Sequence, residues 1–334
     1  MIDAPFQYFP VSSNPFEFNT GLRVIKPGNN AEDKIFQVDS EWQRYRHAKL
    51  GARAERLDKY VSSHKLSPAT ESRTILYILN QLTHEHPEQF ELTYSQNNAG
   101  LYCSLSDEQL IFDQSLQLIN NTKYQNALDA LCCQVQEDIA IIERRKQRDF
   151  ISYLHLCLPN HWAAEDIIGQ SFIDAHLPVP EMGKINQQAP KLIETLIHKG
   201  PFERFTWGIA TDKRLNHHPV APEGIEQSEW QGRRFDPDKP ELNLRIERQT
   251  TTGLPEVHAF IFTIRTYHRA VNGLSSDELT ALKHAILTMP DPIKAYKGLH
   301  GQSDEICGYL DLMLASDCNS RTSLSSRSIS TQPL

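Results

Sequence analysis

The chain has no surplus of positive charge and no long hydrophobic run. It contains 34 lysines and arginines against 42 aspartates and glutamates, for a formal net charge of −8. This balance excludes a nucleic-acid binder that relies on bulk positive charge, but it leaves room for a local basic pocket. No stretch reaches the roughly 18 apolar residues that a membrane-spanning helix needs, so we expect no membrane partner. Residues 1–18 lack a basic region followed by an apolar core, and we therefore expect no secretory signal and a cytoplasmic protein.

Cysteines are few and lack the spacing of a metal site. They are Cys103, Cys132, Cys133, Cys157, Cys307 and Cys318. No two of them form a CxxC pair, and several lie in apolar segments, so we expect reduced, buried thiols rather than disulfides or a zinc site. Cys132 and Cys133 are neighbours on a helical pattern, so their side chains point in different directions and joint ligation is not expected.

Common catalytic fingerprints are also missing. The chain has no Walker-type phosphate loop, no GxGxxG after a predicted strand, no HExxH and no GxSxG. These absences disfavour nucleotide-dependent enzymes, zinc proteases of the HExxH type and common serine hydrolases. What remains is a set of charged and polar residues within apolar strands.

Helical patterns dominate the first 145 residues. The composition, 39% hydrophobic and 23% charged over 334 residues, is that of an ordinary globular protein with a substantial core. A further helix is predicted after a capping box at Ser276 and Glu278. The predicted helices cover residues 41–64, 67–86, 107–120, 122–135 and 275–294.

Alternating apolar residues, which are typical of strands, follow in the second half. The predicted strands cover residues 147–159, 202–212, 241–251 and 258–268. A polar segment rich in proline and histidine, 213–240, predicts a surface loop. Because loops rather than crossover helices separate the strands, we predict an α+β fold with an antiparallel sheet wrapped by helices. We expect one domain over 1–315, helical in 1–145 and sheet-forming in 146–315, and a disordered tail over 316–334.

His176 lies within the stretch FIDAHLPVP, where a predicted helix ends. Pro178 and Pro180 prevent further helix, so the direction of the imidazole is well fixed. A fixed imidazole can be a metal ligand, a catalytic base or a structural residue, and all three interpretations stay open. The competing histidines are His155, His161, His217, His218, His258 and His268. For His217 and His218, in a polar loop before a proline, we expect solvent exposure.

The predicted strand at 202–212 carries an arginine within an aromatic segment. Strand alternation places Arg204, Thr206 and Gly208 on one face and Phe205 and Trp207 on the other.

The predicted strand at 241–251 presents a polar row formed by Arg245, Glu247 and Gln249. Such a row is either a solvated sheet face with ion pairs or the lining of a ligand site. Arg265, in the next predicted strand, poses the same choice.

Several sequence blocks resemble the haem-dependent oxidative N-demethylase family. The resemblance runs from about Gly21 to about Leu314, and it depends on the order and spacing of the blocks rather than on any one of them. The blocks are GLR (21–23), VDSEW (38–42), QEDIAII (136–142), LPNHWAAEDIIGQSFIDAHLPVP (158–180), RFTW (204–207), RIERQTTTGLP (245–255) and FTIRTY (262–267).

The resemblance implies a fold and an activity. The fold would be a PAS-like antiparallel sheet that binds haem b and is wrapped by additional helices. The activity would be the O2-dependent oxidative N-demethylation of a small secondary amine, with release of formaldehyde. Electrons would come from a flavin and iron–sulfur donor protein.

The resemblance also implies roles for individual residues. His176 matches the histidine of the His-x-Pro-Val-Pro block and would be the axial ligand of the haem iron. Arg204 and Glu247 would be catalytic, the first beside iron-bound oxygen and the second as a proton-handling carboxylate. Trp207, Arg248 and Arg265 would contact the cofactor, with the two arginines as candidates for its propionates.

Two alternatives stay open beside the enzyme. One is a haem-binding PAS-like sensor or carrier without catalysis, and the other is a haem-free relative in which the same residues form only core and ion pairs. Arg204 and Glu247 favour the enzyme, because a sensor needs no proton-handling carboxylate.

Overall fold

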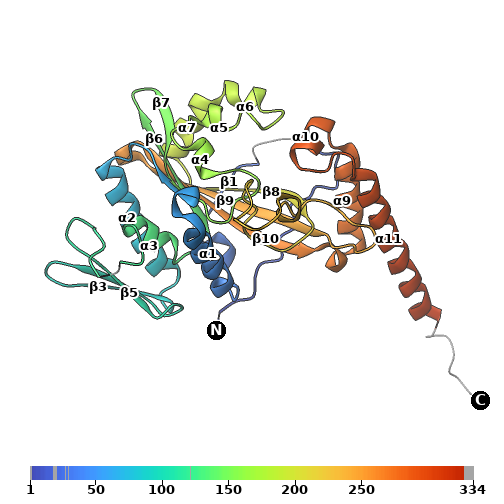
Figure 1. The fold of residues 1–334 in the computed structure, drawn as a ribbon, viewed down its shortest axis with the longest axis horizontal. Coiled ribbons are helices and arrows are strands. Elements are labelled where there is room, and N and C mark those ends of the chain that lie inside the picture. The colour runs from blue at the N-terminus through green and yellow to red at the C-terminus, as the bar shows by residue number, and fades with distance from the viewer. Residues whose placement is uncertain (1, 18–20, 27, 29, 121, 327–334) are drawn as a thin grey trace, which may run out of the picture.

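A seven-stranded antiparallel sheet forms the centre of the computed structural model, which describes residues 2–17, 21–26, 28, 30–120 and 122–326 (Figure 1). Its strand order is β1-β8-β9-β10-β6-β7-β2. The strands are β1 Arg23–Val24, β8 Phe202–Ala210, β9 Asn243–Leu254, β10 Ala259–Ala270, β6 Asp138–Arg145, β7 Arg148–His155 and β2 Val61–Ser63. The predicted α+β class and all four predicted strands of the second half are confirmed.

The long hairpin of β9 and β10 is the core of this sheet. Its two strands have 12 residues each and pair along their whole length. A 3-10 turn, Pro255–Val257, joins them, and His258 closes it in the left-handed region with φ 50°. The pairing of β8 on one side of the hairpin and β6 on the other places both of its strands in the interior of the sheet.

One face of the sheet is covered by a run of short helices (Figure 1). They are α4 Ala164–Ile167, α5 Phe172–Ala175, α6 Gly183–Gln187 and α7 Ala189–His198. Gly253 on β9 shows how closely α7 approaches, because a Cβ atom at this position would lie 2.1 Å from the Ile197 carbonyl oxygen. We call this side of the sheet the α7 face.

The opposite face packs against two separate groups of helices. Towards β6 and β7 it contacts α1 Trp42–Tyr60, α2 Pro68–Glu85 and α3 Ala127–Cys132. Towards β8 and β9 it contacts α9 Ser276–Thr288 and α11 Ser303–Ser326. The short helix α10, Asp291–Tyr296, lies between these last two in the chain.

The helix starts follow local capping chemistry. The Ser67 hydroxyl accepts from the Thr70 N–H at the start of α2, with Pro68 at the first helical position. A reciprocal capping box begins α9, but it joins Ser275 to Glu278, so the predicted Ser276 was one residue late.

The prediction that residues 1–145 are mostly helical is wrong in part. This segment also contains β6 and a separate sheet of β3 Phe90–Tyr94, β4 Ala99–Cys103 and β5 Glu108–Phe112, at the end of the molecule away from α9 and α11 (Figure 1). The predicted helix at 107–120 is β5 and irregular chain instead. Alternate residues Leu110 and Phe112 are buried, and cross-strand packing on β4 outweighs local helix propensity.

The predicted disordered tail, 316–334, overlaps the helix α11, which runs from residue 303 to residue 326. The remaining part of the predicted tail, 327–334, lies outside the described residues. The segment 213–240 is largely loop, as predicted, apart from α8, Gln227–Trp230. A PAS-like topology stays a prediction.

Candidate functional site

The α7 face of β8, β9 and β10 brings polar residues from three strands together. The strand register places Thr206 opposite Glu247 and Glu247 opposite Thr266, while Arg204 pairs with Gln249 and Gly208 with Arg245. The predicted same-face grouping of Arg204 with Thr206 and Gly208 follows from this register. A Cβ atom added at Gly208 would meet nothing within 4 Å, so space is open above this part of the sheet.

Arg204 is a polar group on this face that has no partner of its own among the described residues. Within the described part of the chain its guanidinium makes no hydrogen bond or ion pair, and its Nε is buried without a partner. Burial lowers the pKa of Arg204, and the negative charge of Glu247 opposes that shift. Because a mostly buried guanidinium needs hydrogen-bond acceptors, Arg204 is a candidate donor to a ligand.

Glu247 is 8% exposed, and a side-chain hydrogen bond reaches one of its two carboxylate oxygens. Gln249 Nε2 donates to Glu247 Oε2 at 2.9 Å, and Oε1 has no partner among the described residues. The carboxylate therefore has one fixed oxygen and one that can accept a proton or a hydrogen bond from a ligand.

His176 lies at the C-terminal end of α5, as predicted from the two prolines that follow it. Its Nδ1 lies 2.7 Å from the Phe172 carbonyl oxygen, and the Phe172 ring packs against the imidazole at 4.2 Å between centroids. Burial lowers the pKa of His176, and the nearby Arg204 charge lowers it further. The ring is therefore neutral, with Nδ1–H donating to the carbonyl and Nε2 left free, which is the tautomer that a metal-ligating histidine needs.

Two residues at the end of α10 join this site, and no sequence pattern marks either of them. Lys297 Nζ donates to the Trp207 carbonyl oxygen and lies 5.3 Å from the centroid of the Trp207 ring. Burial lowers the pKa of Lys297 to about 8, and the charge of Glu247 opposes the shift. Burial, with the Glu247 charge, raises the pKa of Tyr296.

The other three predicted cofactor residues lie on the opposite face of the sheet. Arg248 Nε pairs with Glu203 at 2.8 Å, and Arg265 pairs with Asp39 at 2.6 Å in a fully buried position. Trp207 points to the same side and packs near Phe16. Arg248 and Arg265 are thus paired with carboxylates of the chain, and the structure does not bring them together with Arg204.

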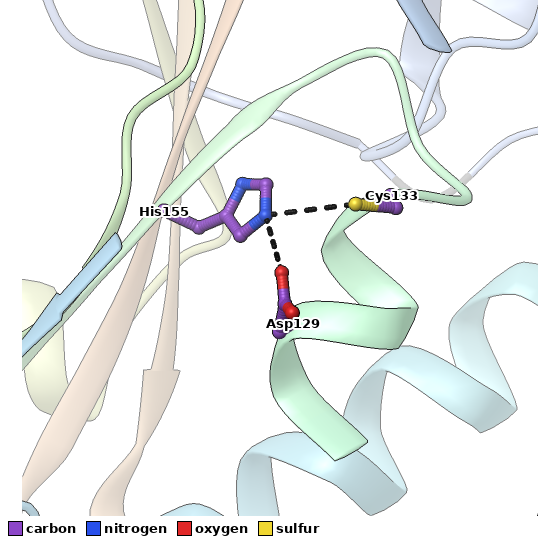
Figure 2. Close-up of side chains that lie close together, drawn as sticks. All are labelled: Asp129, Cys133 and His155. Carbon is purple, nitrogen blue, oxygen red and sulfur yellow. Dashed lines mark hydrogen bonds and ion pairs between the residues drawn. The ribbon is translucent and has the colours of Figure 1, made fainter. Parts of the chain in front are cut away.

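His155 belongs to a buried network rather than to this site. Figure 2 shows its Nε2 pointing at Asp129, 3.2 Å from Oδ1, and at the Cys133 sulfur 3.7 Å away. These three residues have the spacing of metal ligands. Both Asp129 oxygens, however, already accept from Arg53, at 2.8 and 2.6 Å.

The protonation states of this network also argue against a metal. Burial raises the pKa of the Cys133 thiol to about 12 and lowers that of His155 to about 4. Burial alone would raise the pKa of Asp129, but hydrogen bonds from His155 and Arg53 bring it to about 2. Because a metal needs the thiolate, we assign this cluster to the core.

The expectation that His217 and His218 face solvent is wrong, since each is 1% exposed. His217 Nε2 lies 2.8 Å from Asp212 Oδ1, and the His218 carbonyl accepts from the Trp230 indole. The polar composition of the loop concealed these internal partners.

The structure is that of an α+β protein with a candidate site on one sheet face, where a free imidazole nitrogen, an unpaired guanidinium and a carboxylate with one hydrogen-bonded oxygen lie. The sequence model of one family, described as haem-dependent oxidative N-demethylase, alpha subunit-like, matches residues 28–307. The match covers most of the chain, and the protein belongs to this family. The family description makes its members haem-dependent oxidative enzymes.

The residues present fit a haem. His176 offers a free Nε2 and Arg204 an unsatisfied donor, and a Cβ atom added at Gly208 would meet nothing within 4 Å. Among residues 2–17, 21–26, 28, 30–120 and 122–326, no helix is long and apolar enough to cross a membrane.

Proposed function

We propose that this protein is a haem-dependent oxygenase that removes a methyl group from a small secondary amine and releases it as formaldehyde. The observation that carries the proposal is the presence of His176, Arg204 and Glu247 at one site. Each has a functional atom with no partner among the described residues. Of these atoms Arg204 Nε is buried, and a site formed only for stability would satisfy it.

His176 would hold haem b through Nε2. The hydrogen bond from Nδ1 to the Phe172 carbonyl fixes the ring orientation and increases the basicity of the coordinating nitrogen. When bound, the haem supplies the oxygen activation that side chains alone do not provide.

Arg204 and Glu247 would have different roles at the reacting centre, the first as a hydrogen-bond donor and the second as a proton acceptor. The Arg204 guanidinium donates to oxygen atoms that carry negative charge. Glu247 Oε1 accepts a hydrogen bond or a proton from the ammonium form of the amine, while Gln249 keeps Oε2 in place. Deprotonation is needed because only the neutral amine has a nitrogen lone pair and is readily oxidised.

Electrons would come from a separate flavin and iron–sulfur protein, because the described residues include no flavin-binding fingerprint. The five described cysteines are free and buried, which fits a reducing cytoplasm and leaves no exposed cluster ligand.

The first experiment is an absorption spectrum of the haem-reconstituted protein, before and after reduction and addition of CO. We expect a Soret band that shifts with CO, and loss of this band or of its five-coordinate character in His176→Ala. His300→Ala, at an exposed histidine, is the matched control and should keep the wild-type spectrum. An unchanged spectrum in His176→Ala would rule this histidine out as the ligand.

The same preparation tests the activity. With a chemical reductant, O2 and dimethylamine, we expect formaldehyde in proportion to the O2 consumed. A normal haem spectrum without formaldehyde from any of several secondary amines would support the sensor or carrier instead.

A further inference from the structure

Next to Glu247, five basic side chains gather with almost no acidic partner. We call this group the Arg233 cluster; it consists of Arg233, Arg245, His161, His217 and His268. The strand register places Arg245 and His268 opposite each other on the α7 face, two residues from Glu247 and Thr266 respectively. The cluster therefore continues the proposed site along the same strands.

Arg233 has no partner for its guanidinium within the described ranges. Its side chain lies against Gly298, just after α10, where an added Cβ would be 2.6 Å from the Arg233 Cδ and 3.1 Å from Nε. The preceding Gly232 is equally confined, since an added Cβ would lie 2.4 Å from Asp212 Oδ2. Two glycines in the left-handed region thus position this arginine, with φ 59° at Gly232 and 72° at Gly298.

Arg245 is a buried cation that meets only neutral acceptors. Its NH2 group donates to the carbonyl oxygens of Leu158 and Leu215, both at 3.0 Å. It has no carboxylate within ion-pair distance in the described chain, and its Nε is buried without a partner. Its charge therefore stays largely uncompensated.

The three histidines are held around these arginines. His161 N–H donates to the His217 carbonyl at 2.9 Å, and the two rings stack with centroids 5.3 Å apart. Both ring nitrogens of His268 and Nδ1 of His217 are buried with no hydrogen-bond partner. Burial, with the neighbouring arginines, lowers the pKa of His161 to about 2, so at neutral pH this ring is an uncharged donor or acceptor.

The local charge balance is positive. Asp212 is already bound by Arg214 and His217. Glu247, which forms no ion pair among the described residues, is the carboxylate whose charge reaches Arg204 and Arg245. Burial lowers the pKa of Arg233 to about 10, and the nearby Arg245 charge adds to this shift. Uncompensated buried charge is costly, so a cluster of this kind implies an anionic ligand.

We propose that the Arg233 cluster is a carboxylate-binding site that continues the haem and amine site. This inference deepens the proposed function and rests on it. A carboxylate matches the fork of Arg233, and the uncharged histidines supply further donors. The carboxylate has two sources in this setting: a propionate of the haem, or the acid group of an N-methylated amino acid whose amine faces Glu247.

The experiment compares Arg233→Ala with Arg234→Ala in the full-length chain. Arg234 is the exposed neighbour on the same loop, so it is the matched control. Both apo-proteins are titrated with haem and with haem dimethyl ester, and the haem-loaded proteins with N-methylglycine and dimethylamine, by absorption. Arg233→Lys keeps the charge and serves if the alanine variant fails to fold.

If the carboxylate is a propionate, Arg233→Ala weakens haem binding by roughly thirtyfold and does not weaken binding of the ester. If it belongs to the substrate, haem binding is unchanged, and N-methylglycine binding is weakened while dimethylamine binding is not. Equal behaviour of Arg233→Ala and Arg234→Ala towards all four probes would overturn the proposal, with haem binding and the proposed function intact. Should none of the proteins bind haem, the proposed function fails, and calorimetry of N-methylglycine with the apo-proteins still decides the carboxylate site.

Discussion

Both faces of the β8–β9–β10 sheet carry arginines, but the two faces differ in whether these arginines have a carboxylate partner. On one face, Arg248 and Arg265 each bind a carboxylate of the chain itself, Glu203 and Asp39. On the α7 face, Arg204 and Arg233 bind none within the described residues. The comparison shows that an arginine on a strand does not by itself reveal a site, whereas the lack of a carboxylate partner distinguishes the arginines of the α7 face from Arg248 and Arg265.

Glu247→Gln should give the largest effect. The amide keeps the shape and a partner for Gln249 but cannot take a proton, so we expect turnover to fall about 10²- to 10⁴-fold. The haem spectrum should be unchanged, and Glu223→Gln, at an exposed glutamate, should behave as wild type. Formaldehyde release with saturating amine measures this, and retained turnover would remove Glu247 from the chemistry.

Arg265→Ala tests the paired face through stability. It leaves Asp39 buried without its ion-pair partner, so we expect a loss of about 3–5 kcal/mol in the free energy of unfolding. Arg204→Ala removes a cation with no partner and should cost less than about 1 kcal/mol. Urea unfolding of both variants measures the difference, and equal losses would break the contrast between the faces.

The buried His155 network should make the protein sensitive to acid. His155 has its pKa lowered from 6.5 to about 4, so the unfolded chain takes up a proton in this interval and the folded chain does not. Stability is then present above pH 6.5 and falls by about 3 kcal/mol as the pH drops to 4. In His155→Gln this part of the loss should vanish, while the exposed His300→Gln should keep the wild-type pH dependence of urea unfolding.

Two glycines on the α7 face, Gly253 and Gly208, differ in the space around them. Replacing each by alanine should give the smallest changes in stability. Gly253→Ala drives a methyl group into the Ile197 carbonyl and should cost about 1–3 kcal/mol. Gly208→Ala enters open space and should change stability by less than about 0.5 kcal/mol. Thermal unfolding compares the two, and a large loss at Gly208 would mean that the space above it is already filled.

Much of the sheet could be predicted from the sequence. The strands at 147–159, 202–212, 241–251 and 258–268 alternate clearly, and alternation also placed Arg204 apart from Trp207 on β8. The strand at 108–112 was missed because Leu110, Ile111 and Phe112 fit a helix as well as a strand, and only pairing with β4 decides between them.

The site was predictable only where a local pattern marked it. The prolines after His176 fixed its position at a helix end, and strand alternation fixed Glu247. Nothing local marks Lys297 or Arg233, because the place of Lys297 near Glu247 and of Arg233 near Arg245 depends on the packing of α10 and of the loop before β9. The ion pairs that occupy Arg248 and Arg265 likewise depend on long-range contacts with Glu203 and Asp39.

The β9–β10 hairpin has a consequence for the order in which the protein folds. Its strands are joined by only four residues, the turn Pro255–Val257 and His258, so their contacts are close in sequence and need little loop closure. Hairpins of this kind form within microseconds, long before distant segments dock. Arg245, Glu247, Thr266 and His268 would therefore be in register early, and the segments that carry His176 and Arg233 would complete the pocket last.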